Sequence, residues 1–185
     1  MPRSTGPLLC LLSLAALCLA CGCRWFETEE QLQQLYNQSD EVFAGQPLAA
    51  IPPGEPGMSK RFLGGYDVLL RVTRRLKGQT RRDTLLVLQG YDNCARKFVK
   101  GDTVYVFAHT VRHVQALPRE DEEDEGEDSY FDEQLQTYYK SGGTFRVKRY
   151  QKWARRYPAV ATNQCISFTN QHALVPAFFR AKKDK

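Results

Sequence analysis

The sequence lacks the short motifs that identify the common classes of enzyme. It contains no Gly-x-Ser-x-Gly nucleophile motif and no glycine-rich phosphate-binding loop. Only three histidines are present, and the carboxylates outside residues 120–133 are scattered along the chain. If the cysteines are oxidised, no thiol is left for a histidine to activate as a nucleophile. We therefore expect a protein that is not an enzyme and that carries no cofactor.

The sequence also lacks an apolar run of the roughly 20 residues that a membrane-spanning helix needs. Its apolar stretch Leu8–Leu19 is shorter and follows the positive charge of Arg3, which is typical of an export signal. Small residues at Cys18 and Ala20 favour cleavage before Cys21. We therefore expect a secreted, extracellular protein of about 165 residues, a length that suits a single domain.

Cysteine is scarce in the expected mature protein. Two of the six cysteines fall in residues 1–20, the predicted signal peptide. The other four are Cys21, Cys23, Cys94 and Cys165, and an even number in an exported chain indicates disulfide bonds. Cys21 and Cys23 stand one residue apart and cannot easily pair with each other, so each would need a distant partner. Cleavage before Cys23 fits the same rule almost as well, and either choice leaves a cysteine as the first residue.

One segment of the chain contains no Lys or Arg. Residues 120–133 hold 10 of the 21 acids, so that the rest of the chain carries 26 bases against 11 acids. A run of like charges is typical of a solvated loop without fixed structure, and we expect such an acidic loop over residues 119–133. A second interpretation is that this loop folds over the basic part of the protein as a counter-charge.

The excess bases form two groups along the sequence. They are Arg71, Arg74, Arg75, Lys77, Arg81 and Arg82 in the first group, and Arg146, Lys148, Arg149, Lys152, Arg155 and Arg156 in the second. Tyr150, Trp153 and Tyr157 are interleaved with the second group, a combination that some barrels use to bind nucleic acid. An exported protein rarely meets nucleic acid, so we expect no such partner and favour an anionic polysaccharide or lipid surface. Solubility alone is the competing explanation.

Hydrophobic periodicity predicts a short helix followed mainly by strands. Thr28 and Gln31 form a capping box that begins the helix, and Leu32 and Leu35 lie on one face of it. The expected strands are residues 42–51, 66–76, 84–88, 103–111, 144–150 and 159–168, and further helices are expected over 133–140 and 170–179. The regular spacing of the strands indicates a small antiparallel barrel or sandwich.

Several of these segments resemble one known family. They are Cys21-x-Cys23, Ser39–Gly45, Asn93-Cys94, Gly101–Ala108 and Cys165–Phe168. Together they resemble the tissue inhibitors of metalloproteinases and their shorter bacterial relatives, which contain the netrin-like module. The likeness covers residues 21 to about 168. It implies an all-β fold, a five-stranded antiparallel OB-fold-like barrel with short flanking helices, in one domain over residues 21–180 with a basic tail over 181–185.

The resemblance also implies a set of disulfides and an inhibitory site. The pairing order of the family would join Cys21 to Cys94 and Cys23 to Cys165. The freed α-amino group and the carbonyl of Cys21 would chelate the zinc of a metalloproteinase, the expected partner of a monomeric inhibitor. The inhibitory ridge would consist of Cys21, Gly22, Cys23, Arg24, Asp92 and Asn93. Gly22 departs from the family pattern because it has no side chain to enter the specificity pocket of a protease, so we expect weak inhibition.

Two other interpretations of the same residues stay open. Leu17–Cys21 resembles a degenerate bacterial lipobox, in which Cys21 would be acylated and would anchor the protein in the cell envelope. A thioether at Cys21 would leave Cys94 as a free thiol, and for this reason we favour the disulfide-bonded terminus. The second interpretation is that the protein is a cell-envelope or matrix adaptor, which binds its partner through its basic residues and does not bind a protease.

Overall fold

The structure is a computed structural model that describes residues 26–51, 67–89, 98–117, 129–140, 143–162, 166–169 and 171–182, without the side chains of 143–146. The predicted signal peptide and most of the predicted acidic loop lie outside these residues. The elements in chain order are α2 (Glu29–Gln38), β1 (Glu41–Ile51), β2 (Asp67–Lys77), β3 (Thr84–Gln89), β4 (Val104–Val111), β5 (His113–Ala116), β6 (Tyr130–Asp132), β7 (Thr137–Lys140), α3 (Gly143–Arg156), β8 (Ala159–Thr162), β9 (Ser167–Thr169) and α4 (Leu174–Ala181).

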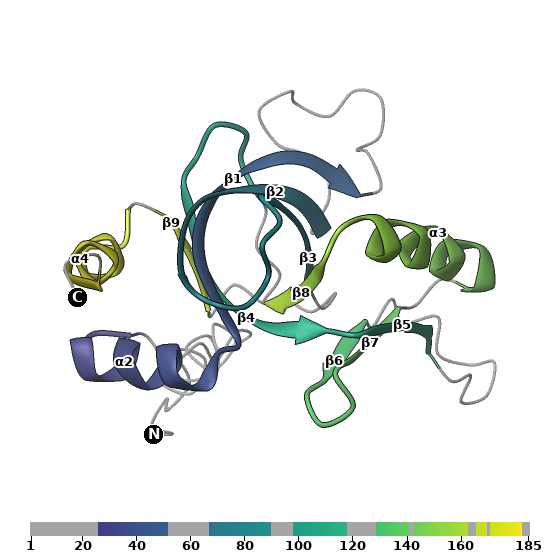
Figure 1. Ribbon diagram of the computed structural model, residues 1–185, viewed down its shortest axis with the longest axis horizontal. Helices are drawn as coiled ribbons and strands as arrows, with labels where there is room; N and C mark the ends of the chain where they lie inside the picture. Colours follow the sequence, from purple (N-terminus) through teal and green to yellow (C-terminus); the bar gives the residue numbers. More distant parts are fainter. Residues whose placement is uncertain are drawn as a thin grey trace, which may run out of the picture.

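Five strands close into a barrel, which Figure 1 shows with the helices around it. The hydrogen-bonded order is β1, β2, β3, β8 and β4, and β4 pairs in turn with β1. The predicted all-β, OB-fold-like barrel with short flanking helices is therefore confirmed. The predicted antiparallel arrangement holds for four of the five pairings and is wrong for the fifth, because β3 and β8 pair in parallel. Closure gives each of these five strands a paired neighbour on both sides over part of its length.

Side chains from the strands fill three apolar clusters. Leu85 and Val87 of β3 lie in the interior cluster, to which all five barrel strands contribute, whereas Leu86 and Leu88 lie in a second cluster on the outside of the sheet. Successive side chains of a strand point to opposite faces. Because both faces of β3 are covered, its sequence reads as a continuous apolar run rather than an alternating one.

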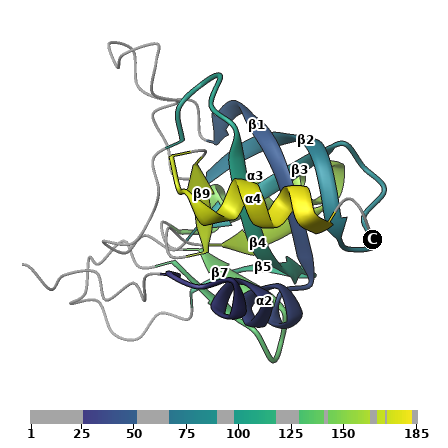
Figure 2. The same cartoon turned by 90° about the vertical axis from the view of Figure 1, so that its left-hand side faces the viewer.

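Helices cover the barrel on opposite sides. The second cluster lies beneath α3, and the third lies beneath α2 and α4 and contains Val42, Phe107 and Phe168. In Figure 1 α3 lies on the right of the barrel and α4 on the left, and in Figure 2 α4 lies in front of the barrel with α3 behind it. The third cluster therefore belongs to the side of the molecule on which the described chain begins and ends.

The prediction of a strand over residues 144–150 is wrong. This segment belongs to α3, which runs over Gly143–Arg156. Val147 and Tyr150 are buried and lie three residues apart. Ala154, four residues after Tyr150, packs with it on the second apolar cluster, so the burial has the period of a helix. Gly143, predicted as part of a turn before a strand, is instead the first residue of the helix.

The prediction of a helix over residues 133–140 is also wrong. The strands β6 and β7 form an antiparallel pair here, and β7 also pairs with β5 in a three-stranded sheet beside the barrel. Gln136 allows the turn between them with a φ of 49°, a conformation that is uncommon for residues other than glycine. No Gly or Asn marks this turn in the sequence.

Most of the remaining elements agree with the predictions within a few residues, but β5 was not predicted, β6 lies at the end of the predicted acidic loop, and one predicted strand is divided. The Thr28 capping box is present, with the Thr28 side chain accepting from the Gln31 amide at 3.2 Å. The expected strand over 159–168 is two strands, β8 and β9, which pair with different parts of β4. The expected helix over 170–179 is α4, which begins at Leu174.

Lys140 and Asp67 form an ion pair in the interior of the protein. Lys140 Nζ lies 2.8 Å from Asp67 Oδ2, and both side chains are fully buried. The Nζ atom also lies 5.8 Å and 4.7 Å from the ring centroids of Tyr138 and Tyr150. A buried ion pair is stable only when further hydrogen bonds satisfy its remaining atoms.

Those hydrogen bonds come from several elements. The Gln89 amide donates to Asp67 Oδ1 at 2.8 Å. The Tyr150 hydroxyl lies 2.8 Å from both Asp67 Oδ2 and the Ile51 carbonyl, and it can donate to one of them at a time. The ion pair therefore joins the ends of β1, β2 and β3 to β7 of the small sheet and to α3.

We expect the substitution Lys140→Met to lower the free energy of unfolding by about 3–5 kcal/mol, because it leaves the Asp67 carboxylate buried without a counter-ion. Urea unfolding of the two proteins measures the difference. The matched control is Lys152→Met on the exposed face of α3, which should change stability by less than about 0.5 kcal/mol. A loss below about 1 kcal/mol for Lys140→Met would contradict the structural role of the ion pair.

Candidate functional site

Every residue of the predicted inhibitory ridge lies outside the described residues. These are Cys21, Gly22, Cys23, Arg24, Asp92 and Asn93, and the same holds for the disulfide partners Cys94 and Cys165. The disulfides and the zinc-chelating role of Cys21 therefore stay predictions. The structure does describe the part of the barrel to which these segments are connected.

The described chain begins next to the strand that follows Cys165. The rings of Phe26 and Phe168 meet edge to face, with centroids 5.7 Å apart. Phe26 stands three residues after Cys23, and Phe168 stands three residues after Cys165. Three extended residues span at most about 11 Å, so the chain lengths from this contact would permit a bond between the two cysteines.

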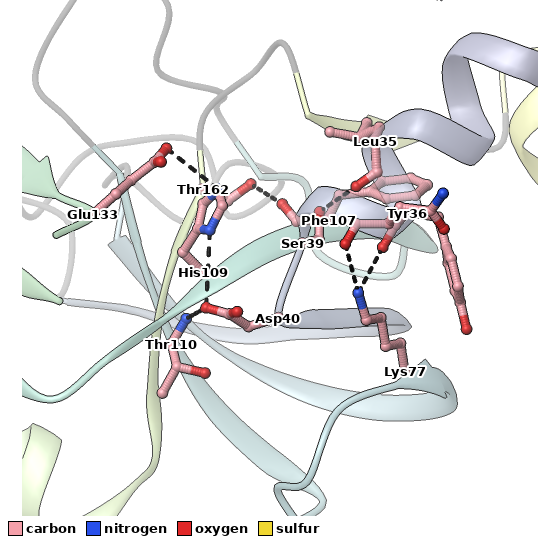
Figure 3. A network of polar contacts seen from close by, with 11 residues as sticks. Leu35, Tyr36, Ser39, Asp40, Lys77, Phe107, His109, Thr110, Glu133 and Thr162 are labelled. Carbon is pink, nitrogen blue, oxygen red and sulfur yellow. Dashed lines mark hydrogen bonds and ion pairs between the residues drawn. The ribbon is translucent and has the colours of Figure 1, made fainter.

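Polar contacts hold the carboxyl end of α2 against the barrel, as Figure 3 shows. Lys77 Nζ donates to the carbonyls of Tyr36 and Asn37 in the last turn of α2, each at 2.9 Å. The Ser39 hydroxyl donates to the Leu35 carbonyl at 2.8 Å. A cation at the carboxyl end of a helix also interacts favourably with the helix dipole. The base from which the amino terminus extends is therefore held by both apolar and polar contacts.

His109 of β4 lies between two carboxylates (Figure 3). Its Nδ1 atom is 3.8 Å from Asp40 Oδ2, and its Nε2 atom is 3.5 Å from Glu133 Oε1. The ring stacks on Phe131 at 5.9 Å. His113 is exposed on β5. Within the described parts of the chain, no three His, Cys, Asp or Glu residues are grouped so that they could hold a metal ion.

Three of the six bases in the first basic group are occupied by contacts inside the protein. Arg74 donates to the Phe179 carbonyl in α4, Arg75 pairs with Glu41, and Lys77 caps α2 as described above. A hollow of about 810 Å³ at this end of the β2–β3 hairpin is lined by Arg74, Arg75, Arg81 and Asp83, among others. Because two of these arginines are already paired and Asp83 is an acid, the hollow offers little net positive charge to a ligand.

Glu41 is the buried acid that neutralises this group. Its Oε1 atom accepts from the amides of Gln79 and Thr80, each at 3.1 Å, and its Oε2 atom accepts from Arg75. Gly78 makes the close approach possible, because a Cβ at this position would lie 2.0 Å from Glu41 Oε2. The sequence analysis missed this role of Glu41, since its partners lie 34 to 39 residues away in the chain.

The second basic group behaves differently, because α3 presents it to solvent. Its exposed members are Lys148, Arg149, Lys152, Arg155 and Arg156, while the side chain of Arg146 lies outside the described part of the structure. Among the described residues, none of these five side chains makes a hydrogen bond or an ion pair, and the only ring contact is that of Arg156 with Tyr157 at 5.4 Å. We call this set of five side chains the α3 basic face.

The two basic groups therefore do not form one surface. Arg74 of the first group contacts α4, and α4 and α3 lie on opposite sides of the barrel (Figures 1 and 2). The interleaved aromatic residues of the second group do not lie on its exposed face. Tyr150 is fully buried, and Trp153 and Tyr157 stack on each other at 5.7 Å and pack on the second apolar cluster.

Comparisons of the chain with protein-family models, with curated proteins and with solved structures found no significant match. The likeness to the tissue inhibitors of metalloproteinases accordingly stays a prediction that depends on the sequence segments quoted above. Among the helices that the structure describes, none is long and apolar enough to cross a bilayer.

We expect Gly78→Ala to destabilise the protein clearly more than Gly101→Ala does. Both glycines have positive φ angles, 125° and 91°, which cost a residue with a side chain about 1–2 kcal/mol. Only at Gly78 would the new methyl group also displace the Glu41 carboxylate, since the Cβ at Gly101 meets nothing within 4 Å. Thermal unfolding measures the stability that each variant loses. Equal losses in Gly78→Ala and Gly101→Ala would argue against the role assigned to Glu41.

Proposed function

We propose that the protein is a secreted, non-catalytic inhibitor that binds a zinc metalloproteinase through its amino terminus. The observation that supports the proposal most is the contact between Phe26 and Phe168, which holds the first described residue against the strand that follows Cys165. A disulfide between Cys23 and Cys165 would fit this arrangement, because both cysteines lie within three residues of the contact. The five-stranded barrel is the fold that the resemblance implied, which adds support.

The chemistry depends on a rigid amino terminus. A free α-amino group has a pKa near 7.7–8.0 in model peptides, so about a fifth to a third of it is neutral at physiological pH and can donate its lone pair to zinc. A ligand that is already fixed in its bound orientation loses little conformational freedom when it binds. The Phe26 contact and the capped helix α2 would supply that fixed base, and Cys21 would supply the amine and the carbonyl.

The first test adds one alanine before Cys21 and measures inhibition against a panel of zinc metalloproteinases. The extension should abolish inhibition, because it turns the amine of Cys21 into an amide and places a residue where the metal should be. The control carries the same alanine after Lys185 and should inhibit as the parent does. Peptide mapping of the same preparations should find Cys23 bonded to Cys165. Inhibition that survives the extension, or a different pairing, would overturn the proposal.

The second test fills the position that the resemblance places in the specificity pocket. We expect Gly22→Leu to lower the inhibition constant by roughly 10- to 150-fold against a protease with a deep pocket, since burying an aliphatic side chain contributes about 1.5–3 kcal/mol. Gly22→Ala is the matched control and should give a much smaller gain. If leucine and alanine give the same inhibition constant as glycine, residue 22 does not enter the pocket.

A further inference from the structure

We propose that the α3 basic face binds a linear anionic polysaccharide, one that carries carboxylate or sulfate groups along its chain. This site is separate from the amino terminus and does not depend on the proposed inhibition. Of the two basic groups in the sequence, the proposal assigns polysaccharide binding to the group on α3 and not to the group on the β2–β3 hairpin. The proposal is carried by three observations: the placement of the five cations, the absence of hydrogen-bond or ion-pair partners for them among the described residues, and the rigidity of the helix beneath them.

The five cations form one stripe along α3. With about 100° between successive residues of a helix, the positions of Lys148, Lys152 and Arg155 fall within about 60° of one another, and Arg149 and Arg156 flank them on one side. At 1.5 Å per residue the stripe is roughly 12 Å long. An elongated row of charges suits a polymer that lies along the helix better than it suits a single small anion.

Within the described residues, nothing neutralises the charge of this stripe. The helix contains no Asp or Glu between Gly143 and Arg156. In the described residues, no acid from another element lies within ion-pair distance of the five side chains. In the first basic group, by contrast, Glu41 and the carbonyls of α2 and α4 occupy three of the six bases.

The helix holds the stripe on a rigid base. Tyr150 is fully buried and bonded into the network of Asp67, and Val147 is buried beside it. The Gln151 side chain donates to the Val114 carbonyl in β5 at 2.9 Å. Binding would therefore order the ends of the long basic side chains but would not have to fold or move the backbone.

The same geometry argues against a membrane and against single-stranded nucleic acid. Peripheral helices that bind bilayers bury apolar side chains between their cations, but the large apolar side chains described in α3 face the barrel, and none is among the exposed ones. Proteins that bind single strands stack bases on exposed aromatic rings. Trp153 and Tyr157 instead stack on each other against the second cluster.

The test compares two triple variants of the full-length mature protein with equal net charge. One carries Lys148→Gln, Lys152→Gln and Arg155→Gln on α3. The other carries Arg71→Gln, Arg81→Gln and Arg82→Gln on the first basic group, where these three side chains are also exposed. Both should unfold at the temperature of the parent within a few degrees, since all six positions lie on the surface.

Binding is measured by titration calorimetry with a size-defined heparin fragment, with polygalacturonate, with vesicles rich in phosphatidylglycerol and with a 20-nucleotide single strand. We expect the α3 variant to bind heparin and polygalacturonate about tenfold more weakly than the parent, because each exposed ion pair contributes a factor of roughly 1.5 to 5. The hairpin variant should change by less than about twofold. The dissociation constant of the parent should rise steeply with added salt.

Each other outcome counts against the proposal. Equal losses in the two variants would show that net charge, and not the α3 basic face, determines binding. Unchanged binding in the α3 variant would show that the α3 basic face is not the binding site. Tighter binding to the vesicles or to the nucleotide strand than to either polysaccharide would assign the face to a different partner. Protease inhibition should be the same in all three proteins, so failure of this site and failure of the inhibitor proposal can be told apart.

Discussion

The ion pair between Lys140 and Asp67 is the contact on which the arrangement of the layers depends. Removing two charges from water costs several kcal/mol for each, and the protein offsets this cost only because the partners converge from different elements. The Gln89 amide and the Tyr150 hydroxyl both bond to the Asp67 carboxylate. The barrel, the three-stranded sheet and α3 also share the second apolar cluster, and the ion pair adds a directional contact that fixes their relative orientation.

That orientation determines which side of α3 faces water. Tyr150 is the residue through which the helix joins the ion pair, and it lies three residues after Val147, which is buried in the same direction. Once this side is turned towards the barrel, the period of the helix places the bases of α3 on the opposite side. A contact in the interior thus explains why five cations are exposed together.

The sequence was sufficient for the parts of the fold that local rules govern. The capping box at Thr28 and the apolar strands of the barrel follow from side-chain chemistry within a few residues, and they were predicted. Two segments were mistaken because distant contacts decide them. Residues 144–150 were predicted to be a strand, but Tyr150 and Ala154 pack on the second cluster at helical spacing. The turn at Gln136 contains no Gly, Asn or Pro, and Asp132 at its start accepts a hydrogen bond from the Leu135 amide without any such residue to mark the turn.

The charged residues show more clearly that local sequence cannot predict contacts between distant parts of the chain. Twelve bases in two groups looked alike in the sequence, yet the partners that occupy Arg75, Lys77 and Arg74 lie 34, 41 and 105 residues away. No local pattern distinguishes a base that is paired across the fold from one that is free. The predicted ridge from Cys21 to Arg24 and the Asn93 segment lie outside the described residues, so for them the sequence is still the whole basis of the prediction.

The two proposed surfaces are compatible because the barrel separates them. Phe26 and the third cluster lie with α2 and α4, and the α3 basic face lies on the other side of the barrel (Figures 1 and 2). A polymer held along α3 would not cover the place from which the amino terminus extends. If both sites act, the α3 basic face would attach the inhibitor to an anionic matrix. The local concentration of the inhibitor near a protease bound to the same matrix would then exceed its concentration in solution. The protein could then inhibit despite the low affinity for the protease that we expect from Gly22, because attachment to the matrix would compensate for part of the affinity that a side chain at this position would supply.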